Sequence, residues 1–152
     1  MASNEIPVID FAPFLNGSDK ISVAQALDSA CRDVGFLVLT GHGVSSDIIQ
    51  RTNKISQEFF ALPDGDKMRL FLGEAAKGYI PPGGEALEQT LDKDSQPNPY
   101  EALAVGPRSD AEDRKLSDNL WPDVPADLRA TWIEYYEAVE SFINQLMQAL
   151  CT

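Results

Sequence analysis

The sequence has few residues that could bind a metal ion or act as a nucleophile. Its 152 residues include one histidine, His42, and two cysteines, Cys31 and Cys151. A structural zinc site takes four Cys or His ligands, and the 2-His-1-carboxylate iron site takes two histidines, so this chain can build neither alone. A Ser-His-Asp or Cys-His arrangement would have to use His42. We therefore predict no catalytic residue, metal ligand or cofactor-binding residue in this chain alone.

Basic residues and long apolar runs are also scarce. The sequence has 12 Lys and Arg residues and 24 Asp and Glu residues, which gives a net charge of −12. This charge disfavours nucleic acid and anionic membrane surfaces as partners. No apolar run approaches the roughly 20 residues of a membrane span. The start of the chain lacks the basic and apolar regions of a secretory signal. Two cysteines without a CxxC motif suggest reduced thiols, so we expect a cytoplasmic location.

The hydrophobic pattern predicts alternating strands and helices in the first half of the chain. Strands are expected at 6–11 and at 36–39, the second of them buried on both faces. A helix from Ser22 to Val34, closed by Gly35, would bury Cys31 as an inert thiol. Two more helices are expected, one from Ser45 or Ser46 to Leu62 and a short one at 64–72.

The second half is expected to be irregular before it becomes helical. Brief strands are predicted at 79–80 and 100–105, within a stretch rich in glycine, proline and acidic residues. From Pro125 apolar residues recur at helical spacing to Leu150, which predicts a helix of about seven turns. No Gly or Asn stop signal and no basic last turn follows, so the chain is expected to be incomplete.

Two apparent ligand-binding motifs have simpler interpretations. Gly41-His42-Gly43 has Ser46 where a dinucleotide fingerprint needs its third glycine, which favours a tight turn in which His42 makes a local hydrogen bond. The acidic alternation that begins at Asp92 has Pro97 and Leu103 where a calcium loop needs Gly and Glu. Neither nucleotide nor calcium binding is predicted.

Six short stretches occur in an order typical of one enzyme family. They are IPVIDF at 6–11, ACRDVGF at 30–36 with GHGV at 41–44, FFALP at 59–63 with Lys67, GY at 78–79 with GE at 84–85, EALAVG at 101–106 and NLWP at 119–122. Together they resemble the N-terminal part of the isopenicillin N synthase-like dioxygenases, the non-haem iron(II), 2-oxoglutarate-dependent family. Leu103 replaces the usual aromatic residue of the fifth stretch. The structural residues of these motifs are Gly35, Phe36, His42, Gly43, Trp121 and Pro122.

The resemblance implies an α+β fold whose helices and short strands flank a jelly-roll (double-stranded β-helix) barrel, with the barrel itself missing from this chain. Residues 1–124 would form the non-haem dioxygenase N-terminal domain. Residues 125–152 would begin the long support helix that leads into the absent Fe(II)/2-oxoglutarate barrel domain. The irregular stretch helps to cover the active-site mouth in the family, so Tyr79 and Glu85 are expected to lie near the substrate.

The family's iron-binding residues have no counterpart here. Iron is held by a His-x-Asp pair and a distant His, and an Arg-x-Ser pair binds 2-oxoglutarate, all on the barrel. The only histidine begins His42-Gly43-Val44 and corresponds to a turn residue, while Arg108 and Ser109 are adjacent and lie too early. The resemblance therefore implies an inactive N-terminal fragment. The intact enzyme would use Fe(II) and 2-oxoglutarate, although some relatives dispense with the latter, to oxidise a small organic substrate.

A second interpretation is a stand-alone, non-catalytic module that binds a protein partner. The long helix carries an apolar stripe that a chain of this length could leave exposed, formed by Trp132, Val139, Ile143 and Leu146. The partner would then be another protein subunit rather than the missing barrel half.

Overall fold

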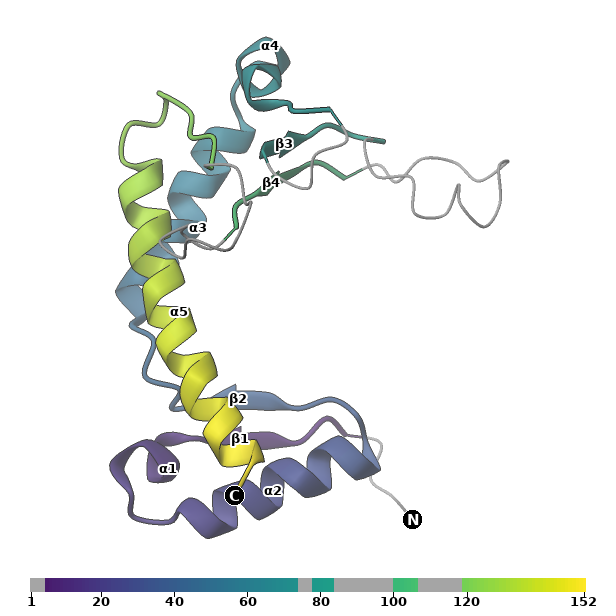
Figure 1. Ribbon diagram of the computed structural model, residues 1–152, viewed down its shortest axis with the longest axis vertical. Coiled ribbons are helices and arrows are strands. Elements are labelled where there is room, and N and C mark those ends of the chain that lie inside the picture. Colours follow the sequence, from purple (N-terminus) through teal and green to yellow (C-terminus); the bar gives the residue numbers. More distant parts are fainter. Residues whose placement is uncertain (1–4, 74–77, 84–99, 107–118) are drawn as a thin grey trace, which may run out of the picture. The chain divides into compact units, whose positions relative to one another are not determined.

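The structure is a computed structural model, and it describes residues 5–73, 78–83, 100–106 and 119–152. It has the expected α+β composition, with short strands and longer helices (Figure 1). The chain divides into two compact units. The first contains the described residues up to Arg51 together with Trp132–Thr152, and the second contains those from Thr52 to Thr131. No helix in the described part of the chain is long and apolar enough to cross a membrane.

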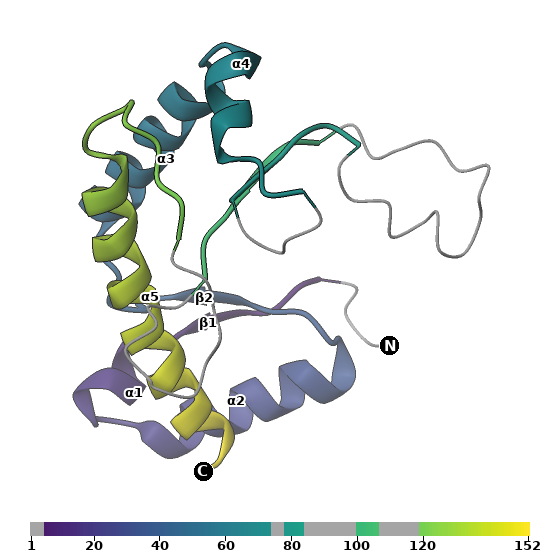
Figure 2. The same cartoon turned by 45° about the horizontal axis from the view of Figure 1, so that its top comes forward.

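The first unit is built on a pair of parallel strands, β1 (Val8–Asp10) and β2 (Val38–Thr40). Helices α1 (Ala12–Asn16) and α2 (Lys20–Asp33) connect them, and α2 lies along one face of the pair (Figure 2). Ile9 pairs with Leu39 on the face that belongs to the core. The buried members of that core are Ile9, Phe11, Phe14, Val23, Leu27, Ala30 and Ala149.

The opposite face of the strand pair is exposed, which corrects the prediction of a strand buried on both faces. Val8 and Val38 pair with each other, and their residues are 66% and 47% exposed. Ile6 and Phe36, two positions earlier in each chain segment, are 55% and 72% exposed. Because side chains alternate along a strand, these four residues share one side. An apolar run on both faces requires a second covering layer, and the described residues do not supply it.

Helix α2 begins and ends at the signals expected from its sequence. The Asp19 side chain accepts a hydrogen bond from the backbone N–H of Ser22, and Gly35 follows the helix with a positive φ of 79°. Its buried residues are Val23, Ala24, Leu27 and Ala30. The prediction of a buried Cys31 is wrong, since this thiol is exposed. Helix α1 was not predicted.

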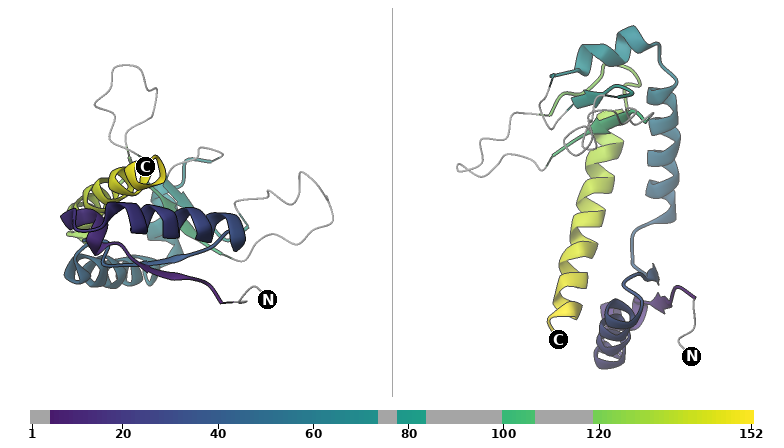
Figure 3. Two further views of the ribbon diagram at one scale, coloured as in Figure 1. Left: turned by 90° about the horizontal axis from the view of Figure 1, so that it is seen from below. Right: turned by 90° about the vertical axis from the view of Figure 1, so that its right-hand side faces the viewer.

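The remaining helices match the expected positions with shifted ends. Helix α3 (Ser46–Phe60) begins after Ser45, whose hydroxyl accepts a hydrogen bond from the Asp47 N–H. The short helix α4 (Asp64–Lys67) continues into the 3-10 turn η1 (Met68–Leu70). Helix α5 (Leu128–Leu150) is a single helix of 23 residues (Figure 3). Arg51 of α3 is hydrogen bonded to Glu134 of α5 at 2.7 Å.

The apolar stripe of α5 is less exposed than predicted. Trp132, Val139 and Leu146 are half-buried, and of the four predicted residues only Ile143 is exposed. The exposed apolar residues of α5 instead form a neighbouring stripe, in which helical spacing brings together Tyr136, Ile143, Met147 and Leu150. The predicted face had been placed too close to the side that packs inward.

The second unit contains an antiparallel pair, β3 (Gly78–Ile80) and β4 (Ala102–Ala104), with Tyr79 opposite Leu103. Beyond β4, the side chain of Asn119 makes two hydrogen bonds to the backbone of Gly106. Its amide donates to the Gly106 carbonyl and its oxygen accepts from the Gly106 N–H, both at 2.9 Å. The Asn119 side chain thus pairs with both backbone groups of the residue two positions beyond β4.

We predict that Gly78→Ala destabilises the protein by roughly 2–3 kcal/mol. Gly78 has a φ of 88°, and an added Cβ would lie 2.3 Å from the backbone oxygen of Leu70. Urea unfolding would measure the loss. Gly65→Ala is the matched control, because Gly65 lies in α4 with nothing within 4 Å of an added Cβ. Equal stability of the two variants would contradict the packing described at β3.

Candidate functional site

The most distinctive polar cluster among the described residues surrounds the buried side chain of Lys67. This residue ends α4, and its side chain is 5% exposed. Its ammonium lies 2.7 Å from Glu101 Oε2, 3.2 Å from Asp64 Oδ1 and 3.2 Å from the backbone oxygen of Phe60. An ammonium has three N–H donors, and here three acceptors surround it. The cost of burying the charge is offset by this complete set of partners.

Each acceptor comes from a different element of the second unit. Phe60 is the last residue of α3, and the carbonyls at the C-terminal end of a helix have no partner within the helix and carry partial negative charge. Asp64 is three residues before Lys67 on α4, and its side chain is 91% exposed. Glu101 immediately precedes β4. The Lys67 cluster, defined as Lys67, Asp64, Glu101 and Tyr79, therefore joins the end of α3, the helix α4 and the β3–β4 pair.

Tyr79 completes the cluster from β3. Its residue is 2% exposed, and its hydroxyl donates a hydrogen bond of 2.5 Å to the same Glu101 oxygen that accepts from Lys67. The ammonium also lies 5.6 Å from the centre of the Tyr79 ring, a distance suited to a cation–π contact. Phe59 packs edge-on to Tyr79 with 6.3 Å between ring centres. The ring is thus held on both its polar and its apolar sides.

These contacts shift the pKa values in directions that preserve the charges at neutral pH. The hydrogen bond to Glu101 raises the pKa of Lys67 above its usual value, and the donors Lys67 and Tyr79 lower the pKa of Glu101. Burial, followed by the hydrogen bond to Glu101, raises the pKa of Tyr79. Lys67 stays protonated, Glu101 ionised and Tyr79 neutral, so none is suited to proton transfer near neutral pH. The hydrogen bonds of the cluster hold the β3–β4 pair against α4 and the end of α3.

No metal site is formed by the residues that the structure describes. Those residues contain no group of three His, Cys, Asp or Glu side chains placed to hold an ion. His42 lies in the turn after β2, where its Nδ1 accepts a hydrogen bond of 3.1 Å from the Val44 N–H, so the expected local bond is confirmed. Its ring lies 5.6 Å from that of Phe142. This donor set does not fit the iron centre of the family.

The two residues expected near a substrate have different outcomes. Tyr79 is buried in the Lys67 cluster, and a direct contact from its hydroxyl to a substrate would compete with the bond to Glu101. Glu85 lies outside the described residues. The proximity of either residue to a substrate stays a prediction.

The motif residues lie at turns, at one exposed position and at partly buried positions. Gly41 and Gly43 flank His42 with positive φ values of 62° and 80°. A Cβ at Gly41 would lie 2.1 Å from the Asp10 oxygen that accepts from the Ala12 N–H, so this turn requires glycine. Gly35 ends α2 and Phe36 is exposed, as described above. Trp121 and Pro122 are half-buried in the second unit.

Lys67 and Glu101 were not predicted as site residues, although both belong to the stretches that carry the family resemblance. A lysine after a helix end and a glutamate before a strand are ordinary surface residues by composition. The two residues are 34 positions apart in the sequence, and only the fold, which brings them together, reveals the ion pair. Their place in two motif stretches was the one signal that could have singled them out.

Comparison with known proteins establishes the family. Residues 6–124 match the family described as the N-terminal region of non-haem dioxygenase in morphine synthesis, and the chain belongs to it. A 2-oxoglutarate-dependent dioxygenase of Didymella fabae is 32% identical over 96% of this chain. Homoarginine-6-hydroxylase 2-ODD-233 of Oryza sativa subsp. japonica is 25% identical over 95% of it. The crystal structure of a full-length Neurospora crassa protein in complex with alpha-KG covers 99% of this chain with a TM-score of 0.78 and 26% identity.

All three relatives are about twice as long as the matched region. The chain covers 45% of the Didymella protein, 48% of the Oryza protein and 47% of the Neurospora chain. The chain thus spans about half the length of the proteins it matches.

We predict that Tyr79→Phe lowers the free energy of unfolding by about 1–2 kcal/mol, because a buried hydrogen bond to a charged group is lost. Thermal unfolding would measure the change. Tyr136→Phe is the control, since Tyr136 is 37% exposed on α5. A loss no larger than that of the control would show that the Tyr79 hydroxyl contributes nothing to the fold.

A separate prediction concerns pH. The pKa of Glu101 is lower in the folded chain than its unfolded value of about 4.3, so its stabilisation is present above that value and is lost as pH falls through the folded pKa. Glu101→Gln should therefore be less stable than the wild type at pH 7, and the difference should shrink between about pH 5 and pH 2. Urea unfolding across this range is the measurement. A difference independent of pH would contradict an ionised Glu101 in the cluster.

Proposed function

We propose that this chain is the N-terminal half of an Fe(II)/2-oxoglutarate-dependent oxygenase that hydroxylates or similarly oxidises a small organic substrate. The observation that carries the proposal is the match along nearly the whole chain to dioxygenases of about twice its length. The family membership of residues 6–124 supports the same reaction class.

The second half would have to supply the reaction centre. The Nδ1 of the sole histidine accepts a hydrogen bond from the Val44 N–H. The described residues contain no group of three side chains placed to hold a metal ion. Residues of the barrel would hold Fe(II) and 2-oxoglutarate, which would supply the activation of oxygen there. We therefore propose that residues 1–152 alone are inactive. Their role would be to support the barrel and to help enclose the substrate.

The exposed face of β1 and β2 supports the proposed arrangement with a jelly-roll barrel. A parallel pair of three-residue strands is too small to be stable alone, and parallel sheets are usually covered on both sides. The face formed by Ile6, Val8, Phe36 and Val38 would be covered by the second half. Within this proposal, residues 1–124 remain the N-terminal domain and 125–152 the start of the support helix.

We also propose a cytoplasmic location for the intact enzyme. Cys31 and Cys151 are both exposed free thiols, which suits a reducing compartment.

A stand-alone module that binds another protein is the second candidate. The exposed stripe of α5, formed by Tyr136, Ile143, Met147 and Leu150, is the observation in its favour. A partner helix could cover these residues without any barrel. The two candidates differ in whether the covering surface is encoded in the same gene.

Sequencing the transcript beyond codon 152 would test the proposed function directly. We expect the reading frame to continue with a His-x-Asp pair, a more distant His and an Arg-x-Ser pair. A frame that stops, or that continues for about 120 codons without His-x-Asp, would favour the stand-alone module. Size-exclusion chromatography of 1–152 adds to this test, because an obligate partner-binding module should not behave as a well-folded monomer.

We predict no 2-oxoglutarate turnover by purified 1–152 supplied with Fe(II), ascorbate and 2-oxoglutarate. Succinate formation is the measurement, and the longer chain under identical conditions is the positive control. Succinate above the protein-free background from 1–152 would show that this chain contains a reaction centre of its own.

A further inference from the structure

The turn between β2 and α3, residues 41–45, is held by a side chain that can change its charge near neutral pH. The Nδ1 of His42 accepts a hydrogen bond of 3.1 Å from the Val44 N–H. His42 is the only histidine in the sequence, and histidine is the side chain whose charge ordinarily changes between pH 5 and 8. The residue is half-buried, so its ring remains accessible to protons from solvent.

This hydrogen bond requires one charge state of the ring. A ring nitrogen accepts a hydrogen bond only while it carries no proton, and both nitrogens of a protonated histidine are donors. The Val44 N–H is a donor as well. Protonation of Nδ1 would therefore place two donors against each other, and only the neutral ring with its proton on Nε2 can make the bond.

The backbone of the turn fits closely against its neighbours. Gly41 and Gly43 on either side of His42 both have positive φ values. An added Cβ at Gly41 would meet Asp10 and Ala12, and one at Gly43 would lie 3.2 Å from the Leu15 side chain. In the described part of the chain the Val44 N–H has no backbone acceptor outside this contact. Loss of the His42 acceptor therefore leaves this N–H without a replacement in the same conformation.

Bonds of the same kind recur nearby, but their acceptors do not titrate in this pH range. In each of them a side-chain oxygen accepts from the N–H two residues later in the chain. They join Asp10 to Ala12 at 3.0 Å, Asn16 to Ser18 at 2.9 Å and Ser45 to Asp47 at 3.2 Å. A carboxylate, an amide and a hydroxyl all keep their charge between pH 5 and 8. His42 is thus the titratable member of a set of equivalent bonds.

The surroundings of His42 allow its ring to become charged. Its ring centre lies 5.6 Å from that of Phe142 on α5, and an aromatic ring tolerates a nearby cation. The residues one turn away from Phe142 on α5 are uncharged, and α1 carries no charged residue. Asp10 of β1 borders the turn at Gly41, and Asp47 of α3 is paired with Arg51. The charged groups that border the turn are therefore acidic or already paired, and they do not oppose an imidazolium.

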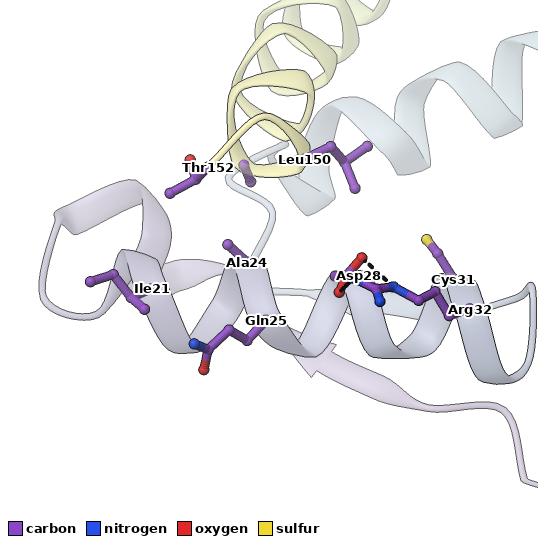
Figure 4. A pocket seen from close by; sticks show the side chains of 9 residues that line it. Ile21, Ala24, Gln25, Asp28, Cys31, Arg32, Leu150 and Thr152 are labelled. Atoms are coloured by element: carbon purple, nitrogen blue, oxygen red, sulfur yellow. Dashed lines mark hydrogen bonds and ion pairs between the residues drawn. The ribbon is translucent and has the colours of Figure 1, made fainter.

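Another polar contact of the first unit lacks this sensitivity to pH. Arg32 donates two hydrogen bonds to the carboxylate of Asp28, drawn as dashed lines beside a groove of about 570 Å³ between α2 and the end of α5 (Figure 4). The hydrogen bond to Asp28 raises the pKa of Arg32, which is far above neutral already. Such a pair keeps both of its charges between pH 5 and 8.

We propose that the turn between β2 and α3 is a pH-sensitive switch. The bond between His42 and Val44 is formed while the ring is neutral, and it breaks when the ring is protonated. Ser45 directly follows Val44 and caps α3, so breaking the bond also loosens the backbone at the start of this helix. The switch is a property of the turn itself and does not depend on the proposed function.

An NMR pH titration of 15N-labelled 1–152 tests the switch, and the single histidine makes the ring signals unambiguous. At about pH 7.5 we expect a neutral ring with an unprotonated Nδ1. Between about pH 7.5 and 5.5 the ring should become protonated, and the protection of the Val44 amide from hydrogen exchange should fall roughly tenfold, as expected for one lost hydrogen bond. Protection is taken relative to an unstructured peptide at the same pH. A proton on Nδ1 at pH 7.5, or protection that is independent of pH, would overturn the proposal.

His42→Asn is the matched control. An asparagine accepts from the N–H two residues later, as Asn16 does, and it does not titrate in this range. The Val44 amide of this variant should keep the same protection at both pH values, and a loss equal to that of the wild type would assign the response to another group, such as Asp10, and overturn the proposal. The Ser18 amide, held by Asn16, is an internal reference in every sample, so the wild-type titration is decisive even without the variant. An equal loss at Ser18 would show general unfolding in acid and would also overturn it.

Discussion

The bond between the Lys67 ammonium and Glu101 is the contact on which the second unit depends. It joins the end of α4 to the residue before β4, 34 positions away. The same Glu101 oxygen accepts the hydrogen bond from the Tyr79 hydroxyl. A charge is expensive to bury, and it is tolerated here because three acceptors surround the ammonium. The same contacts raise the pKa values of Lys67 and Tyr79 and lower that of Glu101, which favours the charged pair and the neutral phenol. The effect of the cluster is to hold β3 and β4 in place.

The first unit, by contrast, depends on apolar burial, and only one face of its strand pair is buried. Helix α2 and the end of α5 enclose Phe11, Leu27 and Ala149, while Val8 and Val38 remain exposed on the other side. Surfaces of this kind are rare on independent domains. The relatives that this chain matches are about twice as long as the matched region, and the exposed face is a surface that a covering layer would bury.

The elements were predictable where local chemistry decides them. Ser45 and Asp19 cap helices, Gly35 ends one, and the apolar spacing from Leu128 onward produces α5. Exposure was less predictable. Phe36 and Cys31 lie in patterns that normally indicate burial, and both are exposed because burial depends on what packs against an element. The candidate site was the hardest to predict, since Lys67 and Glu101 resemble surface residues until the fold brings them within 2.7 Å.

The sequence by itself determined the family and the order of most elements, and it holds one histidine where a 2-His-1-carboxylate iron site takes two. Motif order and the supply of one histidine are properties of the chain that folding does not change. Tertiary structure alone decided which lysine is buried, which face of β1 and β2 is open and where α5 meets α2. Each of these depends on contacts between residues far apart in the chain. Such contacts are selected by the packing and hydrogen bonding of whole elements, and local residue patterns do not encode them one by one.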